Sequence, residues 1–356
     1  MEIQVPTLII DQKKVNNNIN RMLKKVELGN IIFRPHFKTH QLTDIGKLFK
    51  DKRVNSITVS SVSMASYFAN HGWKDITIAF PVNLPEIEEI NKLAGKINLN
   101  VLVESLFSVS IMSNKTTQTL GVFIKIDAGY HRTGLLPNNP EIDKIIKLLD
   151  SNKQLVFRGF LSHAGNTYIA KSKSEILSIM DDSRSILNTL KQKYILQYPD
   201  IIISYGDTPS CSLSDDCRGF DEIRPGNFVY YDVMQNHIGS CSINDIAVAV
   251  ACPVVATHQT RNELVIYGGA VHLSKEFIES EKGLKVFGYV VNFTEEGWSK
   301  PIEGAYVSAL SQEHGIIKMS HQEIAEYKPG DIIGILPIHS CLTANLLHNS
   351  YELVNS

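Results

Sequence analysis

The sequence predicts an α/β protein in which a (β/α)8 barrel is followed by a separate all-β domain. Before about residue 234, eight short apolar segments alternate with helical patterns, the order that is typical of a parallel barrel. After about residue 245, strand-like segments follow one another at short spacing, with Gly, Pro and Asn between them. An open doubly wound sheet would need a glycine-rich dinucleotide turn after its first strand, and the sequence has none there.

The elements of the barrel follow from apolar, partly β-branched runs. The chain opens with a strand-like segment at 6–10, and Asp11 suits the N-cap of an amphipathic helix. The eight barrel strands are expected at 31–33, 56–60, 76–80, 99–103, 121–127, 156–161, 201–204 and 220–224. The helical patterns between them are clearest at 84–93, 140–149 and 174–193.

The β-domain is expected to begin in the segment 234–245. Its strands are predicted at 246–256, 263–267, 284–292, 305–310, 316–319 and 331–336. We therefore assign residues 1–234 to the barrel and residues 235–356 to the β-domain. A chain of 356 residues is long for one hydrophobic core, which also favours two domains.

Composition excludes several classes of protein. A formal net charge of -2 leaves no basic footprint for nucleic acid, so we expect none as a partner. No apolar run reaches the length of a membrane span, and the N-terminal residues do not resemble a signal peptide. Five cysteines are too few for a disulfide framework in a chain of this size. We expect a protein of the reducing cytoplasm.

The segment RPHFKTH, residues 34–40, follows the first barrel strand and contains one lysine among several basic side chains. Arg34, His36 and His40 surround Lys38 in the sequence. Like charge and desolvation both disfavour the charged form of an amine, as a nucleophilic or Schiff-base lysine requires. The alternative is an ordinary solvated basic turn.

Further polar residues follow the later strands at the same end. Asp127 and Arg132 follow the fifth strand, and His163 and Tyr168 follow the sixth. The loops 205–210 and 224–227 follow the seventh and eighth strands. Because barrel enzymes place their chemistry at the C-terminal ends of the strands, these residues are expected to share one face.

The last two loops are suited to bind a phosphate. Gly206 permits close backbone approach, Thr208 supplies a hydroxyl, and Gly226 and Asn227 form a second turn rich in backbone amides. Asp207 would repel a phosphate, so it must point away or cap the following helix. Each loop alone could equally be an ordinary turn.

The segment PIHSC, residues 337–341, places an imidazole and a thiol two residues apart in the β-domain. His339 and Cys341 could share a zinc ion and leave positions open for a substrate. Without further support, a loop histidine and an inert cysteine explain the segment as well.

Taken together, these motifs resemble the D-threonine aldolase and D-serine dehydratase group of pyridoxal 5'-phosphate enzymes, which have the alanine racemase fold type. The resemblance covers nearly the whole chain and is most specific at RPHFKTH and PIHSC. It implies that Lys38 forms the covalent link to the cofactor. The other cofactor-binding residues implied or inferred are Arg132, His163, Tyr168, Tyr205, Gly206, Thr208, Gly226 and Asn227. His339 and Cys341 then bind the metal at the substrate's β-hydroxyl.

The residue at position 341 favours the dehydratase branch. The resemblance associates H-C-D with the aldolases and H-x-C with the zinc-dependent dehydratases, and this chain has His339-Ser340-Cys341. A soft thiolate suits Zn²⁺ better than Mn²⁺ or Mg²⁺. Ile338 and Asp207 depart from the family pattern, which leaves the identity of the substrate open.

The expected reaction is loss of water from a D-3-hydroxy amino acid, with D-serine giving pyruvate and ammonia. Lys38 would remove the Cα proton, and His339 and Cys341 would hold the metal. Retro-aldol cleavage to glycine and an aldehyde is the close alternative. A pyridoxal-phosphate carrier protein, a racemase and a metal-dependent hydrolase are further alternatives. The fold type also implies a homodimer.

Overall fold

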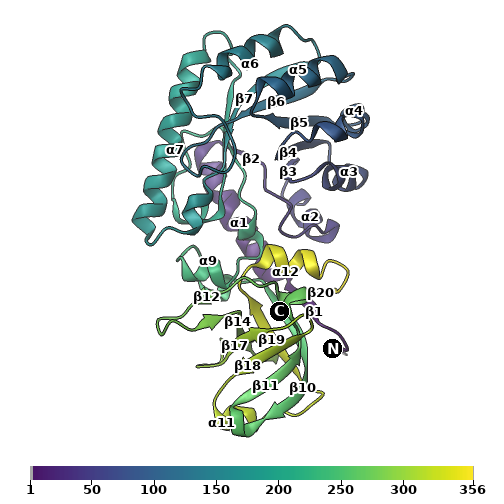
Figure 1. The fold of residues 1–356 in the computed structure, drawn as a ribbon, viewed down its shortest axis with the longest axis vertical. Helices are drawn as coiled ribbons and strands as arrows, with labels where there is room; N and C mark the ends of the chain where they lie inside the picture. Colours follow the sequence, from purple (N-terminus) through teal and green to yellow (C-terminus); the bar gives the residue numbers. More distant parts are fainter. Residues whose placement is uncertain (1–2, 356) are drawn as a thin grey trace. The chain divides into compact units, whose positions relative to one another are not determined.

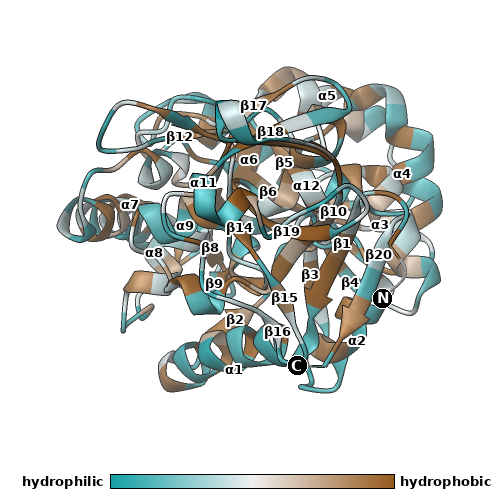
Figure 2. Cartoon of the chain, turned by 90° about the horizontal axis from the view of Figure 1, so that it is seen from below, coloured by the Kyte–Doolittle hydropathy of each residue, from teal (hydrophilic) through white to brown (hydrophobic). Residues whose placement is uncertain are grey.

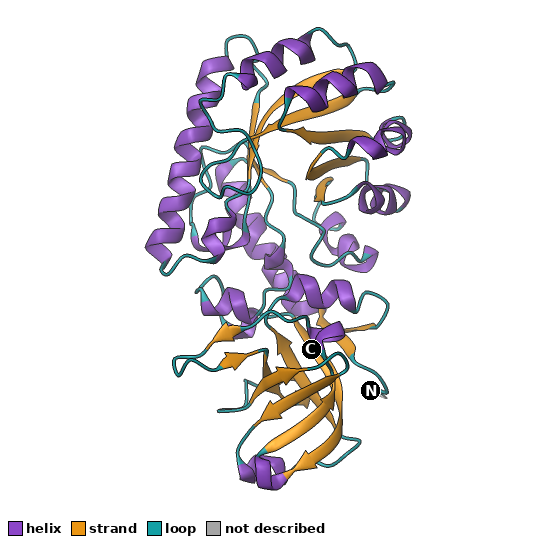
Figure 3. Cartoon of the chain, in the orientation of Figure 1, coloured by secondary structure: helices purple, strands orange, loops and turns teal. Residues whose placement is uncertain are grey.

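The computed structural model describes residues 3–355 and divides them into two compact units. We call them the barrel unit, made of residues 22–38 and 43–226, and the β unit, made of the described residues up to Arg21, the short strap Thr39–Leu42 and the chain from Asn227 onward. Each unit contains one eight-stranded sheet, and helices accompany the strands of the barrel unit (Figures 1 and 3). The predicted fold class is confirmed.

The barrel unit is built on eight parallel strands in the order β2-β9-β8-β7-β6-β5-β4-β3. The strands are β2 (Ile32–Phe33), β3 (Ser56–Val59), β4 (Asp75–Pro81), β5 (Asn98–Val103), β6 (Leu120–Lys125), β7 (Leu155–Ser162), β8 (Ile202–Tyr205) and β9 (Glu222–Ile223). A parallel bridge between His36 and Thr58 joins the two edges of this sheet. Thr58 N donates to Pro35 O at 2.9 Å, and Phe37 N donates to Thr58 O at 2.8 Å. The chain just before Lys38 therefore closes the barrel.

Helices alternate with these strands, as the sequence pattern indicates. They are α1 (Gln12–Gly29), α2 (Thr43–Lys50), α3 (Val62–Asn70), α4 (Ile87–Ala94), α5 (Leu106–Lys115), α6 (Glu141–Asp150), α7 (Lys173–Tyr194) and α8 (Thr208–Leu213), with 3-10 turns η1 (Leu84–Glu86) and η2 (Gly165–Tyr168). Side chains of Ser61, Ser105 and Ser172 cap α3, α5 and α7 by accepting backbone N–H groups. In Figure 2 strands β3 and β4 are brown, whereas α1 carries teal as well, as expected of an amphipathic helix.

The β unit contains a mainly antiparallel sheet in the order β11-β18-β17-β14-β19-β10-β1-β20, with β10 also paired to β11. Its strands are β1 (Thr7–Asp11), β10 (Val248–His258), β11 (Glu263–Tyr267), β14 (Gly288–Val291), β17 (Tyr306–Leu310), β18 (His314–Lys318), β19 (Ile332–Pro337) and β20 (Tyr351–Val354). Short strands β12 (Ile278–Glu279), β13 (Lys285–Val286), β15 (Phe293–Thr294) and β16 (Gly297–Trp298) form two small hairpins.

The remaining helical turns of the β unit are also short. They are η3 (Asn227–Val229), α9 (Val233–His237), η4 (Ile243–Asp245), η5 (Gln259–Arg261), α10 (Ala270–Leu273), α11 (His321–Ile324) and α12 (Ser340–Leu346). Among residues 3–355 no helix is long and apolar enough to cross a membrane. Helix α12 begins directly in the PIHSC segment, so its first turn carries Cys341.

The first strand of the chain differs from the expectation that residues 1–234 belong together. Strand β1 pairs antiparallel with β10 and parallel with β20, both of which belong to the β unit. All five of its residues are buried, as suits a strand with a neighbour on each side. The following helix starts where we expected, because the Asp11 carboxylate accepts the N–H of Lys14 at 3.0 Å.

Candidate functional site

Lys38 stands at the end of a rigid segment. Phe37, the residue before it, is fully buried, and its ring lies 5.1 Å from Phe49, 5.0 Å from Phe68 and 5.0 Å from Trp73, measured between centroids. The backbone N–H of Lys38 donates to His36 Nδ1 at 3.3 Å. The lysine side chain is exposed. Its backbone is thus fixed by the barrel while its amine reaches outward.

The surroundings of Lys38 differ from the expected cluster of cations and apolar walls. Arg34 is buried, and its guanidinium donates to Glu222 at 2.5 Å and to Asp75 at 2.5 Å, so two carboxylates balance its charge. Burial lowers the pKa of His40 to about 3, which leaves the ring neutral. These two residues therefore do not supply the like charge that we expected beside Lys38.

The cations of the barrel unit gather instead around Lys125, the last residue of β6. Burial, and then the charges of Arg224 and Arg132, lower the pKa of Lys125 to about 7. Removal of the His163 ring from water, followed by the charges of Lys125, Lys38 and Arg132, lowers the pKa of His163 well below its usual value. Lys38 therefore lies within electrostatic reach of this group, which we call the cationic cluster: Lys38, Lys125, Arg132 and Arg224.

Two members of the cationic cluster were missed by sequence reasoning. Arg224 follows β9 and is buried; its Nε donates to Ser204 Oγ and its Nη2 to Ser162 O, both at 2.6 Å. Lys125 is a lysine at the end of a fully buried strand, which is the signal that could have identified it.

Arg132 projects from a loop whose shape is fixed by a carboxylate. Asp127 accepts the N–H groups of Gly129 and His131, each at 3.0 Å, and its second oxygen lies 2.9 Å from His131 Nδ1. The N–H of Gly134 donates to Glu104 at 2.5 Å, and the φ of this glycine is +110°. The guanidinium of Arg132 stacks 5.0 Å from the Tyr130 ring centroid and remains exposed. The loop thus presents a cation to solvent in a preset position.

The loop after β8 contains a buried hydroxyl with unused hydrogen-bonding capacity. Thr208 is fully buried, and its Oγ1 has no partner among residues 3–355. The N–H of Thr208 donates to the Tyr168 hydroxyl at 3.4 Å, and His163 Nδ1 lies 2.5 Å from Gly206 O. A Cβ at Gly206 would come within 2.9 Å of the Arg224 backbone. A hydroxyl donor, close-packed backbone and nearby cations fit the phosphate of pyridoxal 5'-phosphate.

Asp207 caps helix α8, which confirms the condition set for a phosphate at this loop. Its two oxygens accept the N–H of Ser210 at 2.7 Å and the Ser210 hydroxyl at 2.6 Å, and Thr167 donates to it at 3.0 Å. Burial raises the pKa of Asp207, although these donors favour the ionised form. The carboxylate is thus occupied by its own helix.

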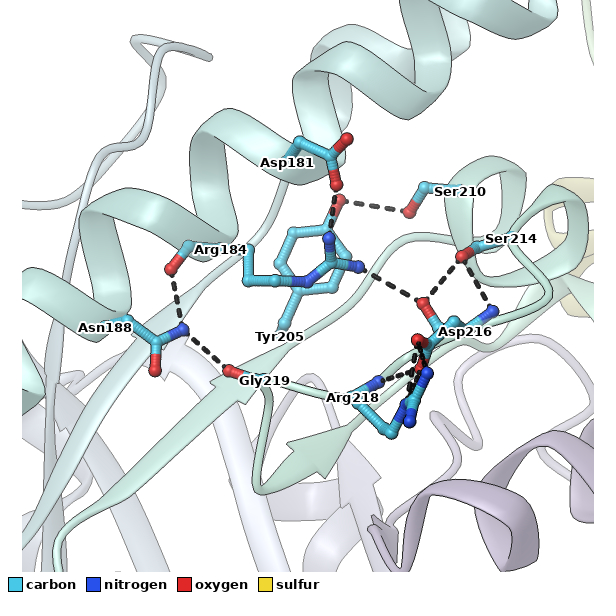
Figure 4. Close-up of polar contacts among 9 residues, drawn as sticks. All are labelled: Asp181, Arg184, Asn188, Tyr205, Ser210, Ser214, Asp216, Arg218 and Gly219. Carbon is cyan, nitrogen blue, oxygen red and sulfur yellow. Dashed lines mark hydrogen bonds and ion pairs between the residues drawn. The ribbon is translucent and has the colours of Figure 1, made fainter.

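Tyr205 packs against two residues that follow it in the chain, Ser210 and Phe220. Its ring is buried and stacks on Phe220 at 4.4 Å between centroids, and its hydroxyl lies 3.0 Å from Ser210 Oγ. Helix α7 fastens the segment after α8, because Arg184 donates to Asp216 O at 3.2 Å and Asn188 donates to Gly219 O at 2.8 Å (Figure 4). The ring and hydroxyl of Tyr205 are therefore engaged within the protein.

The β unit holds the second group of predicted residues, around the sulfur of Cys341. His339 lies close enough to Cys341 for the Cys341 side chain to raise the pKa of the imidazole. Thr39 Oγ1 lies 3.2 Å from Cys341 Sγ, and Asn227 Nδ2 lies 3.5 Å from it. Asn227 Nδ2 also donates to Asp232 at 2.6 Å. Asn227, the predicted partner of Gly226 in the phosphate turn, thus contacts the sulfur within the β unit.

The electrostatics of this sulfur group suit a cation. Burial favours a neutral His339 ring, but the hydrogen bond to Cys341 and the charges of Cys341, Asp232 and Glu276 prevail and raise the pKa of His339 to about 9. Among residues 3–355 no group of three or more His, Cys, Asp and Glu side chains is arranged to hold a metal. An imidazole and a thiolate are donors that Zn²⁺ prefers, so the pair fits zinc as two protein ligands.

Comparison with known proteins places the chain among D-amino acid enzymes. The family model "Alanine racemase, N-terminal domain" matches residues 10–233, and "Putative serine dehydratase domain" matches residues 247–353. The chain is 30% identical to the D-serine dehydratase of Dictyostelium discoideum over 390 residues, 99% of this chain and 96% of that protein. It is 24% identical to the D-threo-3-hydroxyaspartate dehydratase of Delftia sp. HT23 over 353 residues, 96% of this chain and 92% of that protein.

Solved structures share the fold. The structure of the same Delftia dehydratase has a TM-score of 0.91 at 22% identity and covers 99% of this chain and 95% of that one. A variant of that enzyme, described in its metal-free form, has the same TM-score of 0.91. D-threonine aldolase from Filomicrobium marinum has a TM-score of 0.78 at 19% identity and covers 97% of this chain and 90% of that one.

Proposed function

Because the chain belongs to the D-serine dehydratase group of the alanine racemase fold family, a group of pyridoxal-phosphate-dependent lyases, we propose that it removes water from D-serine with zinc as the metal. The products are pyruvate and ammonia. The observation that carries the choice of reaction is the His339–Cys341 pair, a nitrogen and a sulfur donor beside the carboxylates of Asp232 and Glu276, which raise the pKa of His339. A racemase has no use for a metal at the β-carbon.

The cationic cluster is the part of the chain that would hold the cofactor. Lys38 would form the covalent link, and Thr208 and the backbone around Gly206 and Gly226 would receive the phosphate. The unpaired Thr208 hydroxyl supports this assignment, because a buried hydroxyl without a partner is costly unless a ligand supplies one. The loop 127–134 would present Arg132 to the cofactor's 3-oxygen side.

The cofactor supplies an electron sink for the charge that forms at the substrate's Cα, and zinc supplies a Lewis acid for its β-hydroxyl. The exposed Lys38 side chain would supply the amine that takes the Cα proton. His163 stays neutral near pH 7, because its pKa is lowered by burial and the neighbouring cations. The proton taken by Lys38 would then pass to the departing hydroxide, so that water leaves. The remaining unsaturated amine takes up one water and gives a keto acid and ammonia.

Two other substrates are the main alternatives. Retro-aldol cleavage of D-threonine would give glycine and acetaldehyde with the same residues. D-threo-3-hydroxyaspartate is the substrate named for the Delftia relative, and it would need one more cation for its second carboxylate. Cys341, where the resemblance gives aspartate to the aldolases, favours dehydration. We also propose that the enzyme is a cytoplasmic homodimer, as the resemblance implies; sedimentation equilibrium and cell fractionation test these two points.

The decisive experiment identifies products. The purified protein, loaded with pyridoxal 5'-phosphate and Zn²⁺, is incubated separately with D-serine, D-threonine and D-threo-3-hydroxyaspartate, with L-serine as the stereochemical control. We expect pyruvate and ammonia from D-serine, and loss of the activity after chelation. Glycine and acetaldehyde from D-threonine as the fastest reaction would instead assign the enzyme to the aldolases. Full activity on D-serine after complete zinc removal would contradict the metal's part in the proposal.

A further inference from the structure

The sulfur of Cys341 receives two side chains that lie outside the H-x-C motif, and each directly follows a predicted cofactor residue in the chain. Thr39 is the residue after Lys38, and Asn227 is the residue after Gly226. Resting on the proposed zinc site, we propose that Thr39 and Asn227 are positioning residues that hold the Cys341 sulfur as a metal ligand.

Thr39 is fixed against the helix that carries the sulfur. Its side chain is fully buried, with Oγ1 at 3.2 Å from Cys341 Sγ. The strap Thr39–Leu42 is fastened to α12, because Gln41 Nε2 donates to Asn345 Oδ1 at 2.9 Å. Within the strap, the N–H of Leu42 donates to His40 Nδ1 at 3.1 Å. The strap that carries the hydroxyl is therefore fastened to the helix that carries the sulfur.

Asn227 is fixed by a carboxylate that determines which way its amide points. Its Nδ2 donates to Asp232 Oδ2 at 2.6 Å and lies 3.1 Å from Ser340 Oγ and 3.5 Å from Cys341 Sγ. Asp232 also accepts the N–H of Ser340 at 2.9 Å and the N–H of Gln235 at 2.8 Å. Because an ionised carboxylate only accepts, the amide nitrogen, and not its oxygen, faces both Asp232 and the sulfur.

The chemistry of the sulfur gives these contacts a role. Cysteine binds a metal as the thiolate, and a thiolate can only accept hydrogen bonds. With a metal present, both Thr39 Oγ1 and Asn227 Nδ2 must therefore donate to Cys341. Two donors from fixed positions orient the sulfur lone pairs and reduce the cost of holding a thiolate out of water. Groups that orient metal ligands in this way typically contribute 10- to 100-fold to metal affinity.

The first test is a pair of substitutions at Thr39. Thr39→Val keeps the shape of the side chain and removes the hydroxyl, whereas Thr39→Ser keeps the hydroxyl. Zinc affinity of the cofactor-loaded protein is measured by competition with a chromophoric chelator, and thermal unfolding monitors the fold. We expect Thr39→Val to weaken zinc binding about 10- to 100-fold at an unchanged melting temperature, and Thr39→Ser to restore most of the affinity.

A second variant keeps the test decisive if Thr39→Val does not fold. Asn227→Ala removes the other donor, and we expect a loss of zinc affinity in the same range. Zinc affinities of folded Thr39→Val and Asn227→Ala that equal the wild-type value would overturn this inference while leaving the proposed function intact. Failure of the wild-type protein to bind zinc at all would instead refute the metal site on which both rest. Cys341→Ala, which removes the sulfur itself, sets the lower limit of affinity in the assay.

Discussion

Two half-buried histidines, one in each unit, carry pKa shifts of opposite sign. His163 in the barrel unit has a pKa well below its usual value, because removal from water is followed by the charges of Lys125, Lys38 and Arg132. Burial also favours the neutral ring of His339 in the β unit. There, however, Cys341, Asp232 and Glu276 outweigh burial and raise the pKa to about 9. The same side chain thus reports a positive potential in one unit and a negative potential in the other.

The difference indicates what each unit is prepared to bind. The parallel barrel collects cations at the ends of its strands and leaves the Thr208 hydroxyl without a partner, which suits a phosphorylated, anionic cofactor. The β unit brings the His339 imidazole and the Asp232 carboxylate near the Cys341 sulfur, which suits a soft cation. Each unit therefore carries a group of side chains that suits one class of ligand and is poorly suited to the other.

The largest loss of activity should follow from replacing Lys38, the proposed cofactor-linking residue of the barrel unit. Lys38→Ala removes both the covalent link and the proposed base, so we expect turnover of D-serine to fall by at least about 10³-fold. Borohydride reduction followed by mass spectrometry should find no cofactor attached to the variant. Lys92→Ala, an exposed lysine on α4, is the matched control and should behave as the wild type. Attachment of the cofactor to Lys38→Ala would move the link to another lysine.

Replacing Cys341 removes a proposed metal ligand of the β unit and leaves the barrel unit unchanged. Cys341→Ala should reduce turnover of D-serine about 100-fold or more, because the Lewis acid is worth several kcal/mol. The visible absorption of the bound cofactor should not change, since the barrel unit supplies its link. Cys341→Asp sharpens the test by making Mn²⁺ or Mg²⁺ usable. Cys241→Ala is the control, and loss of the cofactor absorption in Cys341→Ala would show that the two groups do not act separately.

A smaller effect is expected from Thr208, the proposed phosphate-binding residue of the barrel unit. Thr208→Val removes one donor to the phosphate and should weaken binding of pyridoxal 5'-phosphate to the apo-protein by about 1–2 kcal/mol. Thr208→Ser keeps the hydroxyl and should bind nearly as the wild type does. Zinc affinity should be unaffected in both variants. Unchanged cofactor affinity in Thr208→Val would place the phosphate elsewhere.

His40 shows what burial does to the pKa of a histidine, because removal of its ring from water is the main cause of the shift. Its folded pKa of about 3 lies below the ordinary value of 6.5, so the unfolded chain takes up the proton first as pH falls. The stability contributed by the neutral ring is therefore complete above about pH 6.5 and is lost towards pH 3, at roughly 1.4 kcal/mol per pH unit. Urea unfolding of His40→Asn, which keeps an acceptor for Leu42, should show a shallower decline below pH 6. An identical slope in both proteins would contradict this assignment.

The sequence was sufficient for the strands and for the polar residues that follow them, because both depend on local patterns. Each predicted barrel strand lies within a few residues of an observed one, and Lys38, Arg132, His163 and Thr208 all follow strands of the barrel. Charge compensation could not be predicted in the same way. Arg34 seemed to add charge beside Lys38, but its partner Glu222 is 188 residues away and meets it only in the closed barrel. The contact between Thr39 and Cys341 could not be predicted either, because the two residues are 302 positions apart in the sequence.

The place of β1 was equally out of reach of local patterns. An apolar strand at the start of the chain carries no information about which sheet it joins, since strand propensity reflects packing against neighbours. Its order in the sequence suggested the barrel, whereas its hydrogen bonds belong to β10 and β20. The error concerned pairing and not the existence of the strand.

The pairing of β1 with β20 has a consequence for synthesis on the ribosome. Thr7–Asp11 is synthesised long before one of its neighbours, Tyr351–Val354, which lies more than 300 residues further along the chain. The barrel strands, which end at Ile223, can pair while the later chain is still being made. The first strand can pair with β10 once Val248–His258 has been made, but its other edge stays uncovered until Tyr351–Val354 follows. We expect the uncovered edge of β1 to be one site of chaperone binding in the nascent protein.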